Sequence, residues 1–153
     1  MSIELEIQRL VEDPSIPADD QLESWVRSAL NGEGHVMVNL RIVDEAEGWA
    51  LNKQWRGRDT ATNVLSFPAD VPSGDDVRVL GDVVICAPVV VRESVKQGKP
   101  LMHHWAHLLI HGLLHLLGYD HINGKHAEVM EAREVEILAG LGIPDPYESP
   151  NES

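Results

Sequence analysis

The chain has 153 residues, which is the length of one domain with a single hydrophobic core. Hydrophobic residues make up 43% and charged residues 24%, a balance that excludes a disordered or fibrous protein. The longest strongly apolar stretch, residues 108–117, is interrupted by two histidines and a glycine and is too short to cross a bilayer. No charged and then apolar leader opens the chain, and the lone Cys86 cannot form an internal disulfide. We therefore expect a single domain over residues 1–153, with no membrane contact and a cytoplasmic location.

The charge is strongly negative, with 12 Lys and Arg against 25 Asp and Glu and a net charge of −13. Such a charge opposes binding to nucleic acid or to an anionic membrane. The acids lie mainly at the two ends, because residues 1–35 and 122–153 net −6 and −5 whereas residues 36–121 net only −2. The eight basic residues of this middle segment either form a local positive surface or are scattered and solvated, and charge alone leaves both readings open.

The predicted elements of the first half are mainly strands. Alternating apolar residues predict strands over residues 3–7 and 36–42. Between them, helical spacing after the candidate N-cap Asp19 predicts a helix that ends before Gly32. The run from Asp44 to Glu47 has the form of an N-cap with an acid three residues on, and it opens a helix to about Trp55. Further strands are predicted over residues 63–67 and 79–86, the second buried on both faces.

The second half of the chain is predicted to be helical. Helices are expected over residues 88–97, 101–117 and 125–139, and the tail from about residue 144 is expected to be loosely ordered. Strands gathered in the first half and helices in the second favour an α+β fold. The helix over residues 101–117 carries leucine and isoleucine on nearly all sides, so it is predicted to be the central, buried one.

Two histidines of this central helix have the spacing of metal ligands. His111 and His115 are four residues apart, which places their side chains about 40° apart around the helix axis and one turn apart along it. Gly118 can take the left-handed conformation that ends a helix, and the returning chain then offers His121 as a third imidazole. Three histidines and an open fourth position are typical of catalytic zinc, whereas a structural site usually has four ligands that include cysteine.

We therefore predict one zinc ion per chain, held by His111, His115 and His121 at the end of the central helix. Other divalent transition metals can compete for such nitrogen sites. The alternative is a chance cluster in a chain with eight histidines. His107 could pair with His111, but no helix-ending glycine then brings a third ligand to the right place. We therefore expect His107 to be a core residue or an outer partner of the site.

The same spacing occurs in the metzincin proteases, whose motif is H-E-x-x-H-x-x-G-x-x-H. Here Gly112 stands where that motif has glutamate, the general base of peptide hydrolysis. A metzincin-like protease is therefore the less favoured alternative.

Residues 111–121, HGLLHLLGYDH, resemble the signature H-G-x-L-H-L-x-G-Y-D-H of the YbeY family of bacterial ribosomal RNA maturation factors. Two further stretches agree with that family: residues 51–68, which include Arg56 and the sequence VLSFP, and residues 80–85, LGDVVI. The resemblance spans about residues 3–141. Ala61 and Asn63 depart from it, since the family often has Pro and Asp there.

The resemblance implies a single α+β domain with a mixed four-stranded sheet, packed with about five helices. It also implies a zinc-dependent, single-strand-type endoribonuclease, a hydrolase that acts in ribosomal RNA maturation at the 3′ end of the small-subunit RNA and in ribosome quality control. The implied partners are ribosomal RNA, ribosomal particles and ribosomal or assembly proteins.

The resemblance further assigns residues. His111, His115 and His121 take the places of the family's zinc ligands, and Arg56 takes the place of its cleft arginine. A metal-activated water or hydroxyl is then expected to attack the phosphodiester while Arg56 stabilises the phosphate charge. Without the resemblance, the alternative for Arg56 is an arginine in the exposed turn from Trp55 to Arg58, with a solvated head. The competing function is that of a metal-stabilised, non-catalytic adaptor in ribosome assembly.

Overall fold

The computed structural model describes residues 2–56, 62–69, 77–119 and 124–147, without the side chains of Trp55 and Arg56. The described elements in chain order are β1 (Ser2–Arg9), α1 (Asp19–Ala29), β2 (His35–Val43), α2 (Glu45–Arg56), β3 (Val64–Pro68), β4 (Arg78–Cys86), α3 (Ala87–Gln97), α4 (Leu101–Leu116) and α5 (Gly124–Gly140). The four strands form one sheet in the order β1-β2-β4-β3, in which β1, β2 and β4 are parallel and β3 is antiparallel to β4. The predicted α+β domain with a mixed four-stranded sheet is confirmed.

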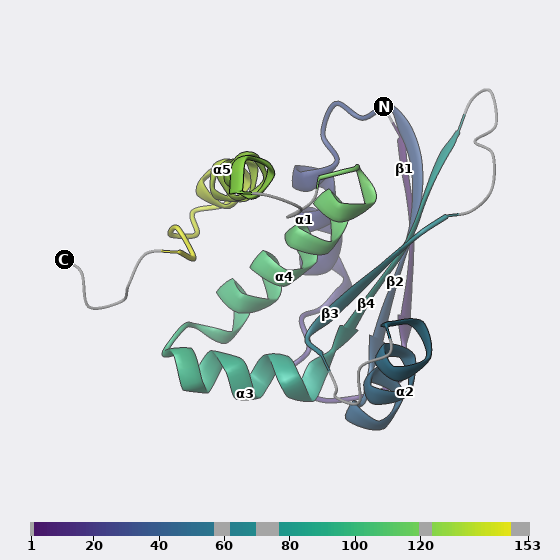
Figure 1. Ribbon diagram of the computed structural model, residues 1–153, viewed down its shortest axis with the longest axis vertical. Coiled ribbons are helices and arrows are strands. Elements are labelled where there is room, and N and C mark those ends of the chain that lie inside the picture. The colour runs from purple at the N-terminus through teal and green to yellow at the C-terminus, as the bar shows by residue number, and fades with distance from the viewer. Residues whose placement is uncertain (1, 57–61, 70–76, 120–123, 148–153) are drawn as a thin grey trace.

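The two faces of the sheet are covered unequally (Figure 1), with α1, α4 and α5 on one side and α2 on the other. The main core lies on the first side, where alternate residues of β2, from Val36 to Ile42, meet α1 and α4. A smaller cluster on the second side joins Val84 and Cys86 of β4 to Leu51 of α2. Since β4 contributes to both clusters, it is buried on both faces, as its nearly unbroken apolar sequence predicts.

The helix starts show where local sequence signals hold and where they do not. At α2 the prediction is confirmed, because the Asp44 carboxylate accepts a hydrogen bond of 2.9 Å from the backbone N–H of Glu47. At α1 the predicted cap is wrong, because the N-cap position is Ala18 and Asp19 is the first helical residue. The Asp19 carboxylate instead pairs with Arg9 at the end of β1, at 2.7 Å.

The central position predicted for the helix over residues 101–117 is also confirmed. α4 packs against α1, α3, α5, β3 and β4, and the side chains of Trp105, Leu109 and Leu114 are fully buried. Among the described helices, none combines the length and the apolar character needed to cross a bilayer. The side of α4 that is least buried is the one that carries His107, His111 and His115.

Gly112 lets α4 approach the sheet closely. A Cβ atom at this position would lie 2.8 Å from Val83 Cγ1 and 3.2 Å from both Ser66 Oγ and Val64 Cγ2. The Ser66 hydroxyl donates a hydrogen bond of 2.9 Å to the Gly112 carbonyl. The glycine that stands in place of the protease glutamate therefore lies in the contact between α4 and the sheet, where a longer side chain has no room.

We predict that Gly112→Ala destabilises the protein by about 1 to 3 kcal/mol, because the added methyl overpacks the contact with β3 and β4. Equilibrium unfolding in denaturant measures the change. Gly140→Ala at the end of α5 is the matched control, since nothing lies within 4 Å of its added Cβ. Equal stability of the two variants would show that α4 does not depend on this close approach.

Candidate functional site

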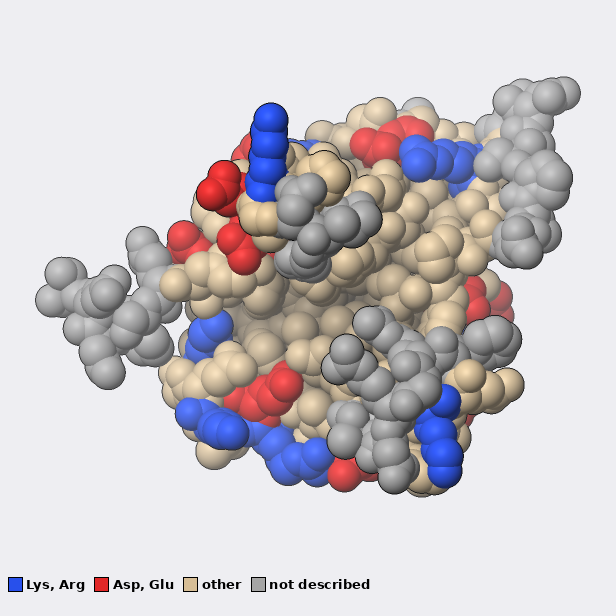
Figure 2. All heavy atoms as spheres, in the orientation of Figure 1, with Lys and Arg blue, Asp and Glu red and all other residues tan. Residues whose placement is uncertain are grey.

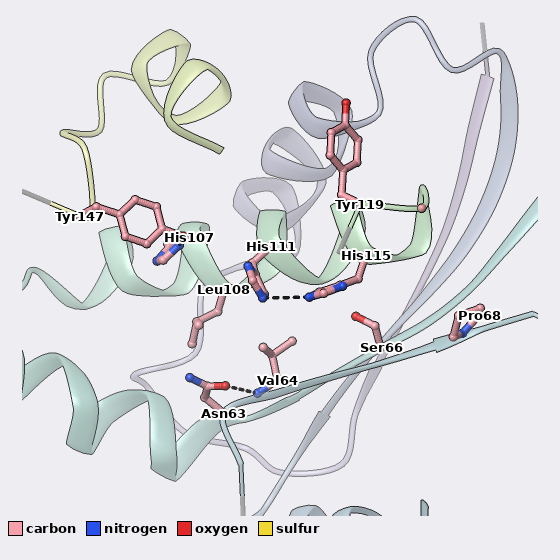
Figure 3. A pocket seen from close by; sticks show the side chains of 11 residues that line it. Asn63, Val64, Ser66, Pro68, His107, Leu108, His111, His115, Tyr119 and Tyr147 are labelled. Atoms are coloured by element: carbon pink, nitrogen blue, oxygen red, sulfur yellow. Dashed lines mark hydrogen bonds between the residues drawn. The ribbon is translucent and has the colours of Figure 1, made fainter. Parts of the chain in front are cut away.

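The histidine face of α4 lines a cleft of about 750 Å³. Figure 2 shows it as a hollow in the middle of this face, surrounded mainly by uncharged residues. Figure 3 shows His107, His111 and His115 along one wall, with Val64 and Ser66 of β3 opposite them. Tyr147 stands at the His107 end and Tyr119 at the His115 end. The cleft therefore lies between a helix and an edge strand of the sheet.

The end of α4 has the geometry that the sequence predicts. Gly118 has a φ of 106°, and its N–H bonds to the His115 carbonyl at 3.1 Å. The next N–H, of Tyr119, bonds to the Leu114 carbonyl at 3.0 Å, which completes a Schellman motif. The chain is thus turned back directly after the second histidine. His121 lies outside the described residues, so its place as a third ligand stays a prediction.

His111 and His115 meet in the cleft, where their Nε2 atoms are 3.1 Å apart (Figure 3). The other ring nitrogen of His111, Nδ1, is hydrogen-bonded to Glu134 Oε1. Because an ionised carboxylate can only accept, Nδ1 of His111 carries the proton and its Nε2 is an acceptor. With this tautomer of a neutral His111, the hydrogen bond between the two rings is donated by His115 Nε2–H.

Glu134 of α5, the partner of His111, is fully buried. Burial by itself raises the pKa of its carboxyl, but hydrogen bonds from His107, His111 and Tyr147 outweigh it and lower the pKa to about 2. His107 Nε2 lies 3.3 Å from Glu134 Oε2, and the Tyr147 hydroxyl donates to the same oxygen. Burial and the nearby Glu134 raise the pKa of Tyr147, so its hydroxyl stays protonated and donates.

His107, His111 and Glu134 form a group that can hold a metal ion, since one ligand atom from each lies within 4.8 Å of the others. The sequence prediction includes only His111 of this group. His107 was expected to be a core residue or an outer partner, and its contact with Glu134 places it beside the predicted ligands. The described residues thus offer two candidate groups of metal ligands that share His111. One consists of His111 and His115, and the other consists of His107, His111 and Glu134.

Sequence reasoning missed Glu134 and Tyr147. For Glu134 a signal exists, because it shares a helix face with Met130, Ile137 and Leu138 and is thus an acid on an otherwise buried stripe. Tyr147 gives no comparable signal, since it follows two prolines in a segment that was expected to be loosely ordered. In the described part of this segment, Tyr147 bonds to Glu134 and the carbonyl of Pro146 accepts a hydrogen bond from Lys99.

A second polar network anchors the β3 wall of the cleft. The Glu93 carboxylate accepts hydrogen bonds from Asn63 Nδ2 at 3.0 Å and from His104 Nε2 at 2.9 Å. Asn63 in turn accepts the N–H of Val64 on its side chain and that of Cys86 on its carbonyl. Asn63 therefore holds the start of β3 against α3 and α4, and this role uses the amide that stands where the resembled family often has a carboxylate.

The described arginines of the middle segment are paired with nearby acids. Each arginine of residues 36–121 whose side chain is described forms an ion pair: Arg41 with Glu47, Arg78 with Glu33 and Arg92 with Glu45. The positive charge of these three arginines is therefore balanced locally. Arg56 is the last residue of α2, and its side chain is not described, so its role in the cleft stays a prediction.

Comparison with known proteins places this geometry in a family. The family model described as endoribonuclease YbeY matches residues 7–142. The proteins named endoribonuclease YbeY from Pseudomonas fluorescens and Pseudomonas putida are 55% and 56% identical over 147 residues, covering 95% of this chain and 96% and 93% of theirs. The chain belongs to the endoribonuclease YbeY family. The Halorhodospira halophila protein of that name is 50% identical over 150 residues, with 95% of this chain and 97% of that protein covered.

A solved structure has a similar fold. The solution structure of TM1509 from Thermotoga maritima has a TM-score of 0.58 to this chain at 25% identity, and 99% of each chain is covered. The stretch matched by the YbeY family model contains all of the predicted site residues, Arg56, His111, His115 and His121, together with Glu134. It ends before Tyr147.

We predict that His104 makes stability depend on pH. Burial in α4 lowers the pKa of His104 below the ordinary value of 6.5, although its bond to Glu93 opposes this. The unfolded chain therefore binds the proton more readily, so the stabilising contribution is present above about pH 6.5 and is lost as the pH falls below it. In the parent, the free energy of unfolding should therefore fall between about pH 7.5 and about pH 5.5. In His104→Gln, which keeps a donor for Glu93, this fall should be smaller.

Denaturant unfolding of metal-free protein at the two pH values measures this effect. His126→Gln is the control, because His126 is exposed on α5. A parent-like pH dependence in the His104 variant would contradict the prediction.

Proposed function

We propose that the protein is a zinc-dependent endoribonuclease that hydrolyses phosphodiester bonds of single-stranded ribosomal RNA. The ion is held by His111, His115 and His121, and Arg56 engages the phosphate. The substrate is the 3′ region of the small-subunit RNA in ribosomal particles, and the activity serves rRNA maturation and ribosome quality control. The observation that carries this proposal is the convergence of two imidazole nitrogens in an open cleft, in a chain whose relatives are named endoribonucleases.

The two described histidines fit a zinc ion. Two nitrogens that each lie about 2.0 Å from a tetrahedral zinc are about 3.3 Å apart. The observed separation of His111 and His115 Nε2 is 3.1 Å, so neither ring has to turn far to share an ion. Binding replaces the proton between them, and zinc affinity should therefore rise with pH.

The Schellman turn supports His121 as the third ligand. The N–H of Tyr119 is already bonded back to the Leu114 carbonyl, and His121 follows two residues later in the sequence. Three neutral imidazoles suit zinc, although copper or nickel compete for nitrogen ligands. Three protein ligands also leave a position for substrate, as catalysis requires.

The other cluster, of His107, His111 and Glu134, suits this function less well. Both Glu134 oxygens already accept hydrogen bonds, and the residue is fully buried. His107 and His111 line the cleft as His115 does, but an ion held by this cluster would have to take a Glu134 oxygen that these hydrogen bonds already occupy. The open cleft also separates the enzyme from a ribosome-assembly adaptor, which needs the metal only to stabilise the helix end.

The chemistry divides between the ion and the chain. When bound, the ion supplies Lewis acidity, which draws charge from a phosphoryl oxygen. Arg56 carries a planar guanidinium that can pair with a phosphate through two parallel hydrogen bonds. A protease needs in addition a base beside the first ligand, and the contact at Gly112 has no room for one.

The net charge of −13 suggests how the substrate is recruited. With the described arginines of the middle segment neutralised by acids, naked RNA should bind weakly. We infer that a ribosomal particle, through its ribosomal or assembly proteins, supplies much of the affinity.

Metal content tests the ligands. His111→Ala and His121→Ala, purified without chelator, should lose nearly all zinc, because two imidazoles remain in each. His126→Ala removes an exposed histidine of α5 and should keep one equivalent. Elemental analysis of the three variants decides, and a full equivalent in either ligand variant would refute the assignment.

Cleavage assays test the reaction. Metal-loaded protein should cut ribosomal RNA in its single-stranded regions and leave unfolded casein intact, and His115→Ala should abolish the RNA cleavage. Arg56→Ala should keep metal content and thermal stability but lose about 100-fold in cleavage rate, because the phosphate loses a charged donor. Arg56→Lys should restore little, since an ammonium cannot make the paired contact.

Arg92→Ala is the matched control for Arg56, because Arg92 pairs with Glu45 on the exposed surface. Cleavage of casein but not of RNA, lost in His115→Ala, would overturn the ribonuclease proposal. Early unfolding of Arg56→Ala would make Arg56 a structural residue.

A further inference from the structure

Glu134 is an acidic residue in a buried, mainly apolar position. It is fully buried, and the residues that share its buried face of α5 are Met130, Ile137 and Leu138. An ionised carboxylate in such surroundings costs several kcal/mol unless its charge is compensated. Its ionic partners among the described residues are two histidines, His107 and His111, rather than a lysine or arginine.

The contacts of Glu134 are divided between its two oxygens. Oε1 accepts the hydrogen bond from His111 Nδ1. Oε2 accepts from the Tyr147 hydroxyl and lies 3.3 Å from His107 Nε2. The His107 ring also meets the Tyr147 ring edge-on, with centroids 5.4 Å apart. The contacts of Oε2 therefore hold the carboxylate in an orientation in which Oε1 faces His111.

We propose that Glu134 is a positioning residue that fixes the tautomer and ring orientation of His111 for metal binding, with Tyr147 holding its carboxylate in place. This inference rests on the proposed metal site. With Nδ1–H bound to Glu134, the lone pair of His111 Nε2 faces His115 across 3.1 Å. Without Glu134, the proton can move to Nε2, which removes the lone pair that an ion needs.

The inference makes the segment after α5 part of the site. This segment is attached at two neighbouring points, by the Tyr147 hydroxyl to Glu134 and by a hydrogen bond of 2.6 Å from Lys99 Nζ to the Pro146 carbonyl. Tyr147 thus connects the end of the described chain to His111, a proposed metal ligand on α4, through the buried carboxylate of Glu134. A carboxylate that orients a ligating histidine commonly contributes 10-fold to about 100-fold in metal affinity.

Zinc affinity, measured by competition with a chromophoric chelator, tests the proposal. Glu134→Gln should weaken zinc binding by about 10-fold to about 100-fold, because an amide orients His111 less strongly. Glu128→Gln is the matched control, since it makes the same charge change at an exposed position of α5 and should leave the affinity unchanged. Equal affinity of the two variants would overturn the proposal. Loss of zinc as complete as in His111→Ala would also overturn it, because Glu134 would then be a ligand.

The imidazole ¹⁵N spectrum of metal-free full-length protein gives a second readout, which a purely structural role would not change. The parent should show His111 protonated at Nδ1, and Glu134→Gln should show a mixture of tautomers. An unchanged tautomer in Glu134→Gln would count against the proposal.

Tyr147→Phe covers the case in which Glu134→Gln fails to fold. It keeps the ring beside His107 and removes only the hydroxyl, and it should weaken zinc binding several-fold in a protein that still folds. Unchanged zinc affinity in this variant would overturn the role of Tyr147. These measurements do not involve RNA, so a parent that binds zinc but cuts no RNA would refute the proposed function and leave this inference standing.

Discussion

The contact of α4 with β3 and β4 at Gly112 is the constraint on which the rest of the structure depends. Because position 112 has no side chain, the helix lies directly against Val83 and Ser66. With its other sides packed on α1, α3 and α5, the one accessible face of α4 is the face that carries the histidines. The cleft between that face and β3 follows from this packing, as do its two walls (Figure 3).

The electrostatics of the molecule are local. The described arginines of the middle segment are each paired with an acid, and the negative charge at the site is the buried carboxylate of Glu134. If an anionic substrate binds in this cleft, the proposed ion and Arg56 are the groups that we expect to attract it locally. This arrangement favours recognition of the phosphodiester bond to be cleaved over general affinity for RNA. It agrees with recruitment of the protein through a larger ribosomal particle.

Much of the fold could be predicted because its signals are local. Alternation along β1 and β2, the Asp44 cap of α2 and the Gly118 turn each depend on residues within a few positions of one another, and the structure confirms all three. The Asp19 cap was wrong for the opposite reason. Its carboxylate pairs with Arg9, a residue ten positions away on β1, and that tertiary contact replaces the local one.

The candidate site likewise combines features set by local sequence with features set by tertiary contacts. The sequence by itself determined that His111 and His115 share a helix face, that the helix ends just after them and that the chain carries the YbeY signature, since all of these are properties of one short stretch. Only the tertiary structure decided that Glu134, 23 residues after His111, lies next to it, and that Tyr147, 13 residues further on, holds that carboxylate. Helical periodicity specifies which residues share a face within one helix, whereas the partner of that face depends on how α5 and the segment after it pack across α4.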